Sequence, residues 1–390
     1  MEKYQTLGAS ASKAGLHNIL KTTGLESTSG LFSAVYPDMA GDKNFSSFLH
    51  CDGAGTKCIV PYLLYKETGN LKYFAGLAQD ALVMNLDDIY CIGNPQSLML
   101  SNTIARSSKL IGDDIIEVLL KSYKELQEKL SDFGINIQLS GGETADCGDT
   151  VRNLVVDAVM AGRIENSKII NASNILPGNI IIGLSSTGKA TYEDSINSGI
   201  SSNGLTLARH ALLSQYNSEK YPEILDPSID KKNSYFGPYK VTDKISNYPL
   251  NVGEALCSPT RTFAPVLKKI YQELPSEISG VIHLTGGAQT KVLRFAKGNH
   301  YIKDNLFPLP TIFQEIQKHG EVSFQELYKV FNCGHRIEIY TDVKNLRTIT
   351  DISKEFGIDA QQIGYVENNS NSEENQVTIK SSYGEFKYTL

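Results

Sequence analysis

The chain has 390 residues, and its 37 Lys and Arg against 43 Asp and Glu leave a formal net charge of −6. With 41% hydrophobic and 21% charged residues, it is too apolar and too weakly charged for a disordered chain, and its acidic balance argues against a nucleic-acid partner. No apolar run approaches the ~18 residues of a membrane span, and residues 1–13 lack the apolar core of an export signal. Six scattered cysteines without a CxxC pair indicate neither a disulfide framework nor a zinc site, so we expect a cytoplasmic protein.

The first half of the chain predicts two helices and several strands. Residues 74–91 are mostly apolar, and residues 113–133 repeat apolar side chains every three or four positions, which is typical of a helix with one buried face. Asp113 or Asp114 is suited to cap the second helix, and Gly134 to end it. Short β-like runs at residues 48–51 and 135–139 each lead into a glycine-rich loop, and residues 154–164 form a further predicted strand.

The second half continues this mixture, with strands predicted at residues 180–184, 281–284 and 336–340 and helices at residues 204–213, 265–274 and 346–356. Because the two kinds of element do not alternate strictly, the pattern favours an α+β fold or an α/β sheet with helices on one side. The length predicts two domains at ~100–200 residues each, which we divide into residues 1–166 and 167–390. Residues 215–251, rich in Tyr, Pro, Ser and Lys, are interpreted as an ordered surface insertion rather than core.

Two glycine-rich segments are alike, Leu-Ser-Gly-Gly at residues 139–142 and Leu-Thr-Gly-Gly at residues 284–287. Two related halves that share an active site are one explanation, and a chance match of four residues is the other. Glycine lets backbone N–H groups approach phosphate closely, but no segment matches the P-loop or the dinucleotide fingerprint. Each segment alone is more often a simple turn, whereas their recurrence beside charged residues favours a phosphate-handling cleft.

Cationic and helix-capping residues lie beside these segments. Lys57 and Lys291 are suited to contact phosphate as point charges, although a solvated surface lysine is the commoner outcome. Ser202 and Asn203 precede a predicted helix, where they serve either an anion site or an ordinary cap. The sequence has no HxxxH or HExxH spacing for a metal and no GxSxG elbow for a serine hydrolase.

The predicted helix at residues 74–91 carries Asp80, Asp87 and Asp88 in an otherwise apolar sequence. At ~100° per residue Asp80 and Asp87 share a face, and a buried carboxylate needs a cation or hydrogen-bond donors. Mg²⁺ is a suitable cation, because it binds one or two carboxylates together with substrate phosphates; an exposed helix end with solvated acids is the alternative. Asp52 and Glu143 follow β runs, and four such carboxylates around one cleft suit two Mg²⁺ ions on a triphosphate.

Seven motifs in chain order resemble those of the phosphoribosylformylglycinamidine cyclo-ligase family, also called aminoimidazole ribonucleotide synthetases. The first half contributes DGAGTK at residues 52–57, DDI at residues 87–89 and GGETAD at residues 141–146. The second half contributes SNG at residues 202–204, SPTR at residues 258–261, HLTGG at residues 283–287 and FNCG at residues 331–334. The motifs cover nearly the whole chain and are collinear.

The resemblance implies an α/β N-terminal domain whose sheet pairs with that of a second copy to form a dimeric barrel, and an α+β C-terminal domain. ATP and a small-molecule nucleotide substrate would occupy the cleft between the domains, with Mg²⁺ as cofactor. The implied reaction of purine biosynthesis converts formylglycinamidine ribonucleotide and ATP to aminoimidazole ribonucleotide, ADP and phosphate. The formyl oxygen is phosphorylated, and an amidine nitrogen then attacks that carbon with loss of phosphate, while the protein positions the reactants and neutralises charge.

The resemblance also implies roles for individual residues. Catalytic roles fall on Lys13, Lys57 and Asp88, and both lysines would contact phosphate. Metal ligation falls on Asp52, Asp88 and Glu143. The implied ATP contacts are Asp52, Gly53, Gly55, Thr56, Asp80, Gly141, Gly142, Glu143 and Asn332. The implied substrate contacts are Ser202, Asn203, Thr285, Gly286 and Gly287.

The chain departs from the family pattern at several points. The family usually has His before SNG, where this chain has Ser201, so the role of that histidine does not transfer. The N-terminal glycine-rich segment is reduced to residues 29–32, residues 189–200 and 215–251 look like insertions, and His335 with Arg336 is an unusual continuation of FNCG. These departures bear on substrate contacts more than on the use of ATP.

Two rival hypotheses stay open. Another ATP-dependent phosphotransferase of the superfamily, such as a selenophosphate synthetase or a thiamine-phosphate kinase, is the first; the former typically uses an early cysteine, whereas the first one here is Cys51. A nucleotide-binding regulatory subunit without catalysis is the second. The presence of Asp52, Asp88 and Glu143 together argues against that second rival, because clustered acids are costly to keep without a function.

Overall fold

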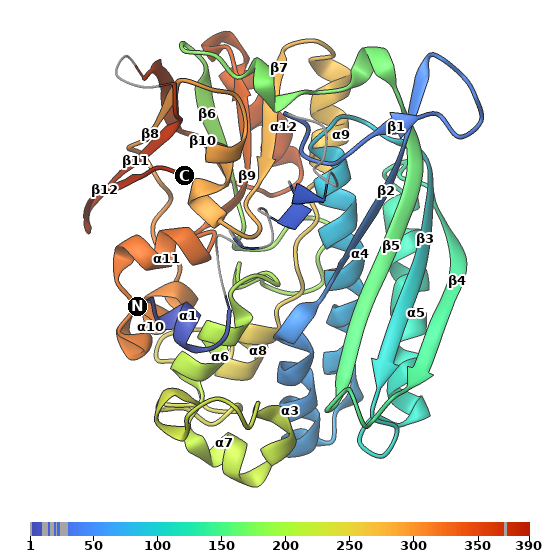
Figure 1. The fold of residues 1–390 in the computed structure, drawn as a ribbon, viewed down its shortest axis with the longest axis vertical. Coiled ribbons are helices and arrows are strands. Elements are labelled where there is room, and N and C mark those ends of the chain that lie inside the picture. The colour runs from blue at the N-terminus through green and yellow to red at the C-terminus, as the bar shows by residue number, and fades with distance from the viewer. Residues whose placement is uncertain (1, 10–14, 16–18, 21, 24–29, 370–372) are drawn as a thin grey trace.

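In the computed structural model the chain forms two β-sheets with helices packed around them (Figure 1). The structure describes residues 2–9, 15, 19–20, 22–23, 30–369 and 373–390. Lys13, for which the resemblance implied a phosphate contact, lies outside these residues. The first sheet ends in sequence at Glu165 and the second begins at Ile180; the division of the chain after residue 166 stays a prediction.

The first sheet has the strand order β1-β2-β5-β3-β4. Neighbouring strands are antiparallel except β3 and β4, which run parallel. Buried and half-buried side chains alternate along most of β5, so one face of the sheet is covered and the other is open, as antiparallel sheets permit. The strands are β1 (Tyr36–Pro37), β2 (Phe45–Gly53), β3 (Gln96–Arg106), β4 (Ile137–Asp146) and β5 (Leu154–Glu165).

Helices cover the inner face of this sheet. The two predicted helices are confirmed as α4 (Ala75–Tyr90) and α5 (Asp113–Ser131); α4 packs against β2 and β5, and α5 against β4 and α4. The N-cap prediction for α5 is wrong, because Gly112 occupies the N-cap and both predicted caps lie in the first turn, where a carboxylate still complements the helix dipole. The prediction that Gly134 ends the helix is confirmed by its φ of +68° and by the hydrogen bond from its N to the Ser131 carbonyl. The other elements here are η1 (Gly55–Cys58), α3 (Ile59–Thr68) and η2 (Leu71–Phe74).

The two similar glycine-rich segments differ in conformation. Residues 140–146 were predicted as a loop, but β4 continues through them to Asp146, with a bulge in its pairing to β3. Gly142 packs so tightly on β3 that a Cβ there would lie 2.3 Å from the Asn102 carbonyl oxygen, so only glycine fits the strand at this point. The second segment is a turn, in which Gly287 has φ +93° and precedes η7 (Ala288–Arg294).

The second half forms a seven-stranded sheet with the order β12-β11-β8-β10-β6-β9-β7. Its three predicted strands are confirmed as β6, β7 and β9. The strands are β6 (Ile180–Ser185), β7 (Ile278–His283), β8 (Asn299–Lys303), β9 (His335–Thr341), β10 (Ala360–Asn368), β11 (Gln376–Ser381) and β12 (Gly384–Tyr388).

The helices of the second half include the three predicted ones, α6, α9 and α12, and the short N-terminal helix α1 packs against α6. They are α1 (Lys3–Thr6), α6 (Leu205–Leu212), α7 (Gln215–Lys220), α8 (Val252–Cys257), α9 (Ala264–Glu273), α10 (Thr311–Gly320), α11 (Phe324–Val330) and α12 (Leu346–Glu355). Single 3-10 turns are η3 (Asn166–Lys168), η4 (Ala172–Asn174), η5 (Pro222–Ile224), η6 (Lys231–Asn233) and η8 (Val343–Asn345).

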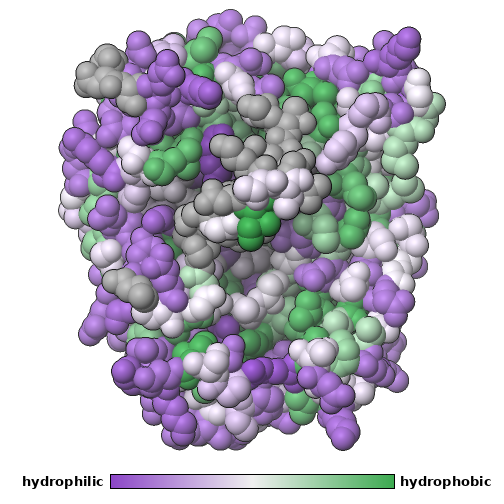
Figure 2. All heavy atoms as spheres, in the orientation of Figure 1, coloured by the Kyte–Doolittle hydropathy of each residue, from purple (hydrophilic) through white to green (hydrophobic). Residues whose placement is uncertain are grey.

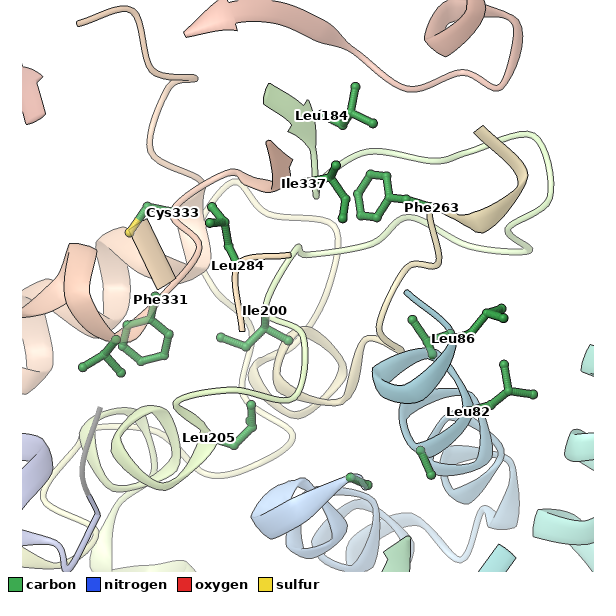
Figure 3. Packing of buried hydrophobic residues seen from close by; sticks show 14 of the residues in the cluster. Leu82, Leu86, Leu184, Ile200, Leu205, Phe263, Leu284, Phe331, Cys333 and Ile337 are labelled. Atoms are coloured by element: carbon green, nitrogen blue, oxygen red, sulfur yellow. The ribbon is translucent and has the colours of Figure 1, made fainter. Parts of the chain in front are cut away.

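One cluster of buried hydrophobic side chains extends through both halves. Figure 3 shows Leu82 and Leu86 of α4 on one side, and Phe263 and Ile337 of the second half on the other. Because α4 lies between its own sheet and the second half, polar residues on α4 are held where the two halves meet.

The segment at residues 215–251 is ordered, as predicted, but it is not only surface. Tyr235 and Val241 are fully buried, so the insertion adds to the core. Figure 2 shows that hydrophilic side chains dominate the outline of this face of the molecule and that smaller hydrophobic patches interrupt them. Within the described part of the chain, no helix is both long and apolar enough to cross a membrane.

Candidate functional site

Three aspartates of α4 face the second half of the chain. Asp80 and Asp87 are fully buried, and Asp88 is 7% exposed. The prediction that Asp80 and Asp87 share a helix face is confirmed, because both contact residues 260–263, just before α9. The alternative of a solvated helix end is wrong. Buried carboxylates require donors or cations, and each of the three has its own set.

Asp80 is the partner of Lys57. Its Oδ1 lies 2.8 Å from Lys57 Nζ and also accepts hydrogen bonds from the backbone N (2.8 Å) and the hydroxyl (2.6 Å) of Thr260. Lys57 is itself fully buried and donates a second hydrogen bond to the Ser258 carbonyl. The phosphate contact implied for Lys57 and the ATP contact implied for Asp80 therefore do not match the structure: both groups are enclosed in one ion pair that joins η1, α4 and the segment before α9.

Asp87 has neutral partners. Its Oδ1 accepts a hydrogen bond from the Thr262 hydroxyl (2.7 Å) and its Oδ2 one from the Phe263 backbone N (2.9 Å). Burial raises the pKa of Asp87 to about 7, although these two hydrogen bonds oppose the rise. Asp87 thus fixes the start of α9 against α4.

Asp88 lies between two histidines. Its Oδ1 is 2.5 Å from His283 Nδ1 at the end of β7, and its Oδ2 is 3.4 Å from His50 Nε2 on β2. Burial would raise the pKa of Asp88, but the hydrogen bonds from both histidines and the charge of His50 hold it well below its usual range. Asp88 therefore carries a negative charge at neutral pH.

The tautomer of His283 follows from its other neighbour. Arg336 Nε donates to His283 Nε2 at 2.6 Å, and because a guanidinium has no acceptor, the ring proton of neutral His283 is on Nδ1, facing Asp88. Burial and the Arg336 charge lower the pKa of His283 to about 4. Arg336 is 1% exposed, and its Nη1 has no hydrogen-bond partner among the described residues.

His50 is held in the protonated form. The amide nitrogen of Asn85 donates to the carbonyls of Ala81, Asp52 and Ala158, so its oxygen accepts the His50 Nδ1 proton at 2.9 Å. Burial alone would lower the pKa of His50, but the Asp88 carboxylate and this hydrogen bond raise it to about 9. The site thus contains three groups in spatial order: the imidazolium of His50, the carboxylate of Asp88 and the neutral imidazole of His283.

Residues around the DGAGTK motif occupy different environments. Asp52, at the end of β2, accepts a hydrogen bond from the Gly53 backbone N at 2.7 Å. Gly53 packs against Asp157, because a Cβ would lie 1.7 Å from that carboxylate. Gly55 has φ +56° with open space beside it, and the exposed Thr56 hydroxyl lies 3.0 Å from that of Thr206 on α6.

The two loops implied to bind substrate lie in the second half. The Ser202 hydroxyl is 3.0 Å from that of Thr260, so this loop is linked through Thr260 to Asp80. Asn203 Oδ1 is buried and receives no hydrogen bond from the described residues. Lys291 Nζ donates to the Thr285 hydroxyl at 3.1 Å.

The turn after β7 and the segment after α11 are both largely buried, but open space lies beside the turn. A Cβ added at Gly286 would meet no described atom within 4 Å, so a ligand has room to approach the backbone there. Gly287 is buried, and a Cβ there would lie 3.7 Å from the Lys291 Cα. Asn332 is 4% exposed and bonds to the Gly199 carbonyl, the Ser186 hydroxyl and the Gly334 backbone N. The ATP contact implied for Asn332 therefore does not match its buried position.

Glu143 lies apart from the aspartates of α4. Its register partners across β3, β5 and β2 are Thr103, Asp157 and Gly53, which form a row on the open face of the sheet. Asp52 belongs to the neighbouring row, whose side chains point to the opposite face. With β5 and β3 between them, at ~4.8 Å per strand, Asp52 and Glu143 are far too separated for one metal ion.

The implied metal site is therefore not assembled within one chain. Across the residues that the structure describes, no group of three His, Cys, Asp or Glu side chains could hold a metal ion. Glu143, together with Gly141 and Gly142, is exposed on the edge strand β4, and Asp88 has a histidine at each oxygen. The carboxylates expected around one cleft are therefore divided. Asp52 and the α4 aspartates lie on the covered side of the first sheet, and Glu143 lies on its open face.

Sequence reasoning missed the partners of the aspartates, namely Asn85, Thr262 and Arg336, and noted His50 and His283 only as neighbours of glycine-rich loops. The signal for His283 was its place at the start of the HLTGG motif, directly after a predicted strand. Arg336 was noticed only as a departure from the family pattern. Its contact with His283 depends on the pairing of β7 with β9, which the sequence does not show.

Comparisons with known proteins agree over most of the chain. Residues 34–164 match the family described as "AIR synthase related protein, N-terminal domain". The chain is 30% identical over 320 residues to the phosphoribosylformylglycinamidine cyclo-ligase of Methanococcus vannielii. The aligned residues make up 82% of this chain and 77% of that protein. The cyclo-ligase of the same name from Methanobrevibacter smithii is 26% identical over 97% of this chain and 94% of its own.

Solved structures share the fold at low sequence identity. The structure "AaThiL complexed with AMPPCP and TMP" superposes with a TM-score of 0.53, at 12% identity, over 96% of both chains. A HypE-HypF complex gives a TM-score of 0.52 at 14% identity over 92% of both chains. These likenesses show a shared fold, with which a two-domain α/β architecture is consistent. The extent and identity of the sequence matches show that this chain belongs to the phosphoribosylformylglycinamidine cyclo-ligase family.

Proposed function

We propose that the chain catalyses the ATP-dependent closure of formylglycinamidine ribonucleotide to aminoimidazole ribonucleotide, with release of ADP and phosphate. The observation that carries the proposal is the match to a cyclo-ligase over 82% of this chain and 77% of the relative, which includes motifs from both halves. A regulatory subunit without catalysis would not need to keep the motif loops of either half. A match that extends through both halves supports the cyclo-ligase over more distant members of the superfamily.

In the proposed reaction the formyl oxygen attacks the γ-phosphorus of ATP, and ADP leaves. The amidine nitrogen that bears the ribose then attacks the formyl carbon, and the C–O bond breaks with loss of phosphate and a proton. Phosphorylation converts a poor leaving group into a good one, so the protein has mainly to position the reactants and neutralise charge.

ATP is the proposed phosphoryl donor, and related folds support this. The AaThiL structure contains AMPPCP, and a T. maritima PurL structure with a TM-score of 0.51 contains ADP. Since the described residues form no three-ligand metal cluster, we propose that Mg²⁺ enters as part of the MgATP substrate, as is usual for phosphate-bound magnesium. The end of β2 (Asp52 to Thr56) is the proposed nucleotide side.

The substrate side is assigned to the loops at residues 202–203 and 285–287. Open space lies beside the half-buried Gly286 of this turn, where backbone N–H groups suit a phosphate, and Lys291 places a cation next to Thr285. Asp88 is enclosed by its histidines, so we assign it a positioning role, in which it keeps His50 protonated beside Asp52.

We further propose a homodimer formed through the open face of the first sheet. Leu49 of β2 is 64% exposed and Met99 of β3 is 49% exposed on this face, where Glu143 also lies. Exposed apolar side chains that neighbour one another on an uncovered sheet face indicate an interface. A second copy packed there would close the sheets into the barrel that the family resemblance implies.

The test is a reaction of the purified chain with MgATP and formylglycinamidine ribonucleotide. We expect ADP and a diazotisable aminoimidazole in equal amounts. ADP that forms only with another acceptor would refute the cyclo-ligase assignment while keeping the phosphotransferase class. Absence of any nucleotide binding would refute both.

A further inference from the structure

The second half contains a polar network that the proposed reaction does not use. We call it the Lys303 network, and its members are at most 4% exposed. It consists of Lys303 on β8, Glu338, His335 and Tyr340 on β9, Gln289 in η7, and Asn332 after α11.

An ion pair lies at the centre of the network. Lys303 Nζ pairs with Glu338 Oε1 and also donates to the Gln289 carbonyl (2.7 Å) and Gln289 Oε1 (3.2 Å), which uses all three of its protons. Glu338 in turn accepts hydrogen bonds from His335 Nε2 (3.0 Å) and from the Tyr340 hydroxyl (2.6 Å). Every buried side-chain N and O atom of the network has a partner.

From the ion pair the network reaches both proposed substrate loops. Gln289 lies two residues after Gly287, and its Nε2 donates to the Asn332 carbonyl at 2.6 Å. Asn332 Nδ2 donates to the Gly199 carbonyl at 2.8 Å, three residues before Ser202. The loop after β7 and the loop before α6 are thus joined through two amide side chains.

The backbone beside the network is strained. Ser201 has φ +67°, Ala288 +40° and Cys333 +53°, and none is a glycine. Each lies within two residues of Gly199, Gln289 or Asn332. Non-glycine residues with positive φ persist only where surrounding structure holds them, and they concentrate at functional sites.

We propose that the Lys303–Glu338 pair positions the loops at residues 199–204 and 285–289 for substrate. The proposal rests on the proposed function, because the resemblance assigns these loops to substrate. A buried ion pair adds little to stability compared with neutral groups of the same shape. What the pair adds here is the fixed placement of Gln289, through which both loops are held.

The first test separates folding from positioning. Lys303→Met leaves Glu338 charged and unpaired, so the melting temperature should fall. Adding Glu338→Gln removes that charge and keeps an acceptor for His335 and a partner for Tyr340, so the double variant should regain most of the lost melting temperature. The KM for formylglycinamidine ribonucleotide should nevertheless stay roughly tenfold or more above wild type, because Gln289 has lost its anchor.

Hydrogen exchange gives a readout that does not need turnover. Amides at residues 199–204 and 285–289 should exchange faster in the double variant than in wild type. Val377→Ala on β11 is the control, because Val377 is fully buried in the same sheet and outside the network. It should lower the melting temperature while leaving the KM and the exchange of both loops unchanged.

Double-variant protein with wild-type KM and wild-type loop exchange would overturn the proposal. If the double variant fails to fold, Gln289→Met decides, since it keeps the ion pair and removes the link to Asn332; wild-type loop exchange in that variant would also overturn the proposal. If wild-type protein does not cyclise the substrate at all, the proposed function fails, and the exchange measurements still decide whether the network holds the loops.

Discussion

Asp88 Oδ1 and His283 Nδ1 lie 2.5 Å apart although 195 positions separate the two residues in the chain. The hydrogen bond joins α4 of the first half to the end of β7, directly before the turn proposed to bind phosphate. Because Arg336 fixes the tautomer of His283, the direction of this hydrogen bond is set. The position of the turn and the charge of His50 therefore depend on the same carboxylate.

Asp88→Asn should lower kcat/KM by roughly a hundredfold, because the charge that organises this site is lost. It should also move the pKa of His50 down from about 9 toward its ordinary value near 6.5. An NMR titration of His50 measures this second effect directly. Asp194→Asn, which removes an exposed ion pair with Lys129, is the control and should change neither quantity. An unchanged His50 titration in Asp88→Asn would contradict the arrangement described.

Lys57→Met should destabilise the chain by about 3–5 kcal/mol, because it leaves the Asp80 carboxylate buried without its cation. Denaturant unfolding measures the loss, and adding Asp80→Asn should recover part of it. If Lys57→Met instead keeps wild-type stability and binds nucleotide more weakly, the ion-pair account is wrong and Lys57 contacts phosphate, as the resemblance implied.

His210 gives a prediction for acid stability. Burial and the neighbouring Arg209 lower its pKa to about 3, so between pH 6.5 and 3 the unfolded state binds a proton that the folded state does not. Stability should therefore fall as pH falls through this range, by up to about 1.4 kcal/mol per pH unit from this residue. His210→Asn keeps an acceptor for the Tyr235 backbone N and should reduce the slope of unfolding free energy between pH 6 and 4.5. Equal slopes in both proteins would show that His210 is protonated in the fold.

Leu49→Arg should dissociate the proposed dimer, because it places a charge in the apolar face of the first sheet. The folded monomer should tolerate the change within about 0.5 kcal/mol, since the side chain is 64% exposed. Leu176→Arg is the matched control, as Leu176 is 61% exposed and lies outside that sheet. Sedimentation should give half the wild-type mass for the first variant only; a dimer in both would place the interface elsewhere.

The helices that carry the site follow from the sequence. Apolar periodicity predicted α4 and α5 within two residues at each end, and the 100° helical step placed Asp80 and Asp87 on one face without any knowledge of their partners. Local patterns are informative here because a helix fixes the relative directions of its own side chains.

Relations between elements were not predictable in the same way. The sequence grouped Glu143 with Asp52, but the strand order puts two strands between them and their side chains point to opposite faces. Glycines at 141 and 142 suggested a loop, whereas the structure uses them for a bulge and a tight contact inside β4. Lys57 was interpreted from its motif, and its true partner became visible only once α4 packed beside η1.

The central claim is that ATP activates the formyl oxygen for ring closure. The direct measurement uses formylglycinamidine ribonucleotide labelled with ¹⁸O at the formyl group, incubated with the purified chain and MgATP. We expect one labelled oxygen in each inorganic phosphate released, together with unlabelled aminoimidazole ribonucleotide and ADP. Phosphate without the label, or label released as water, would contradict the claim.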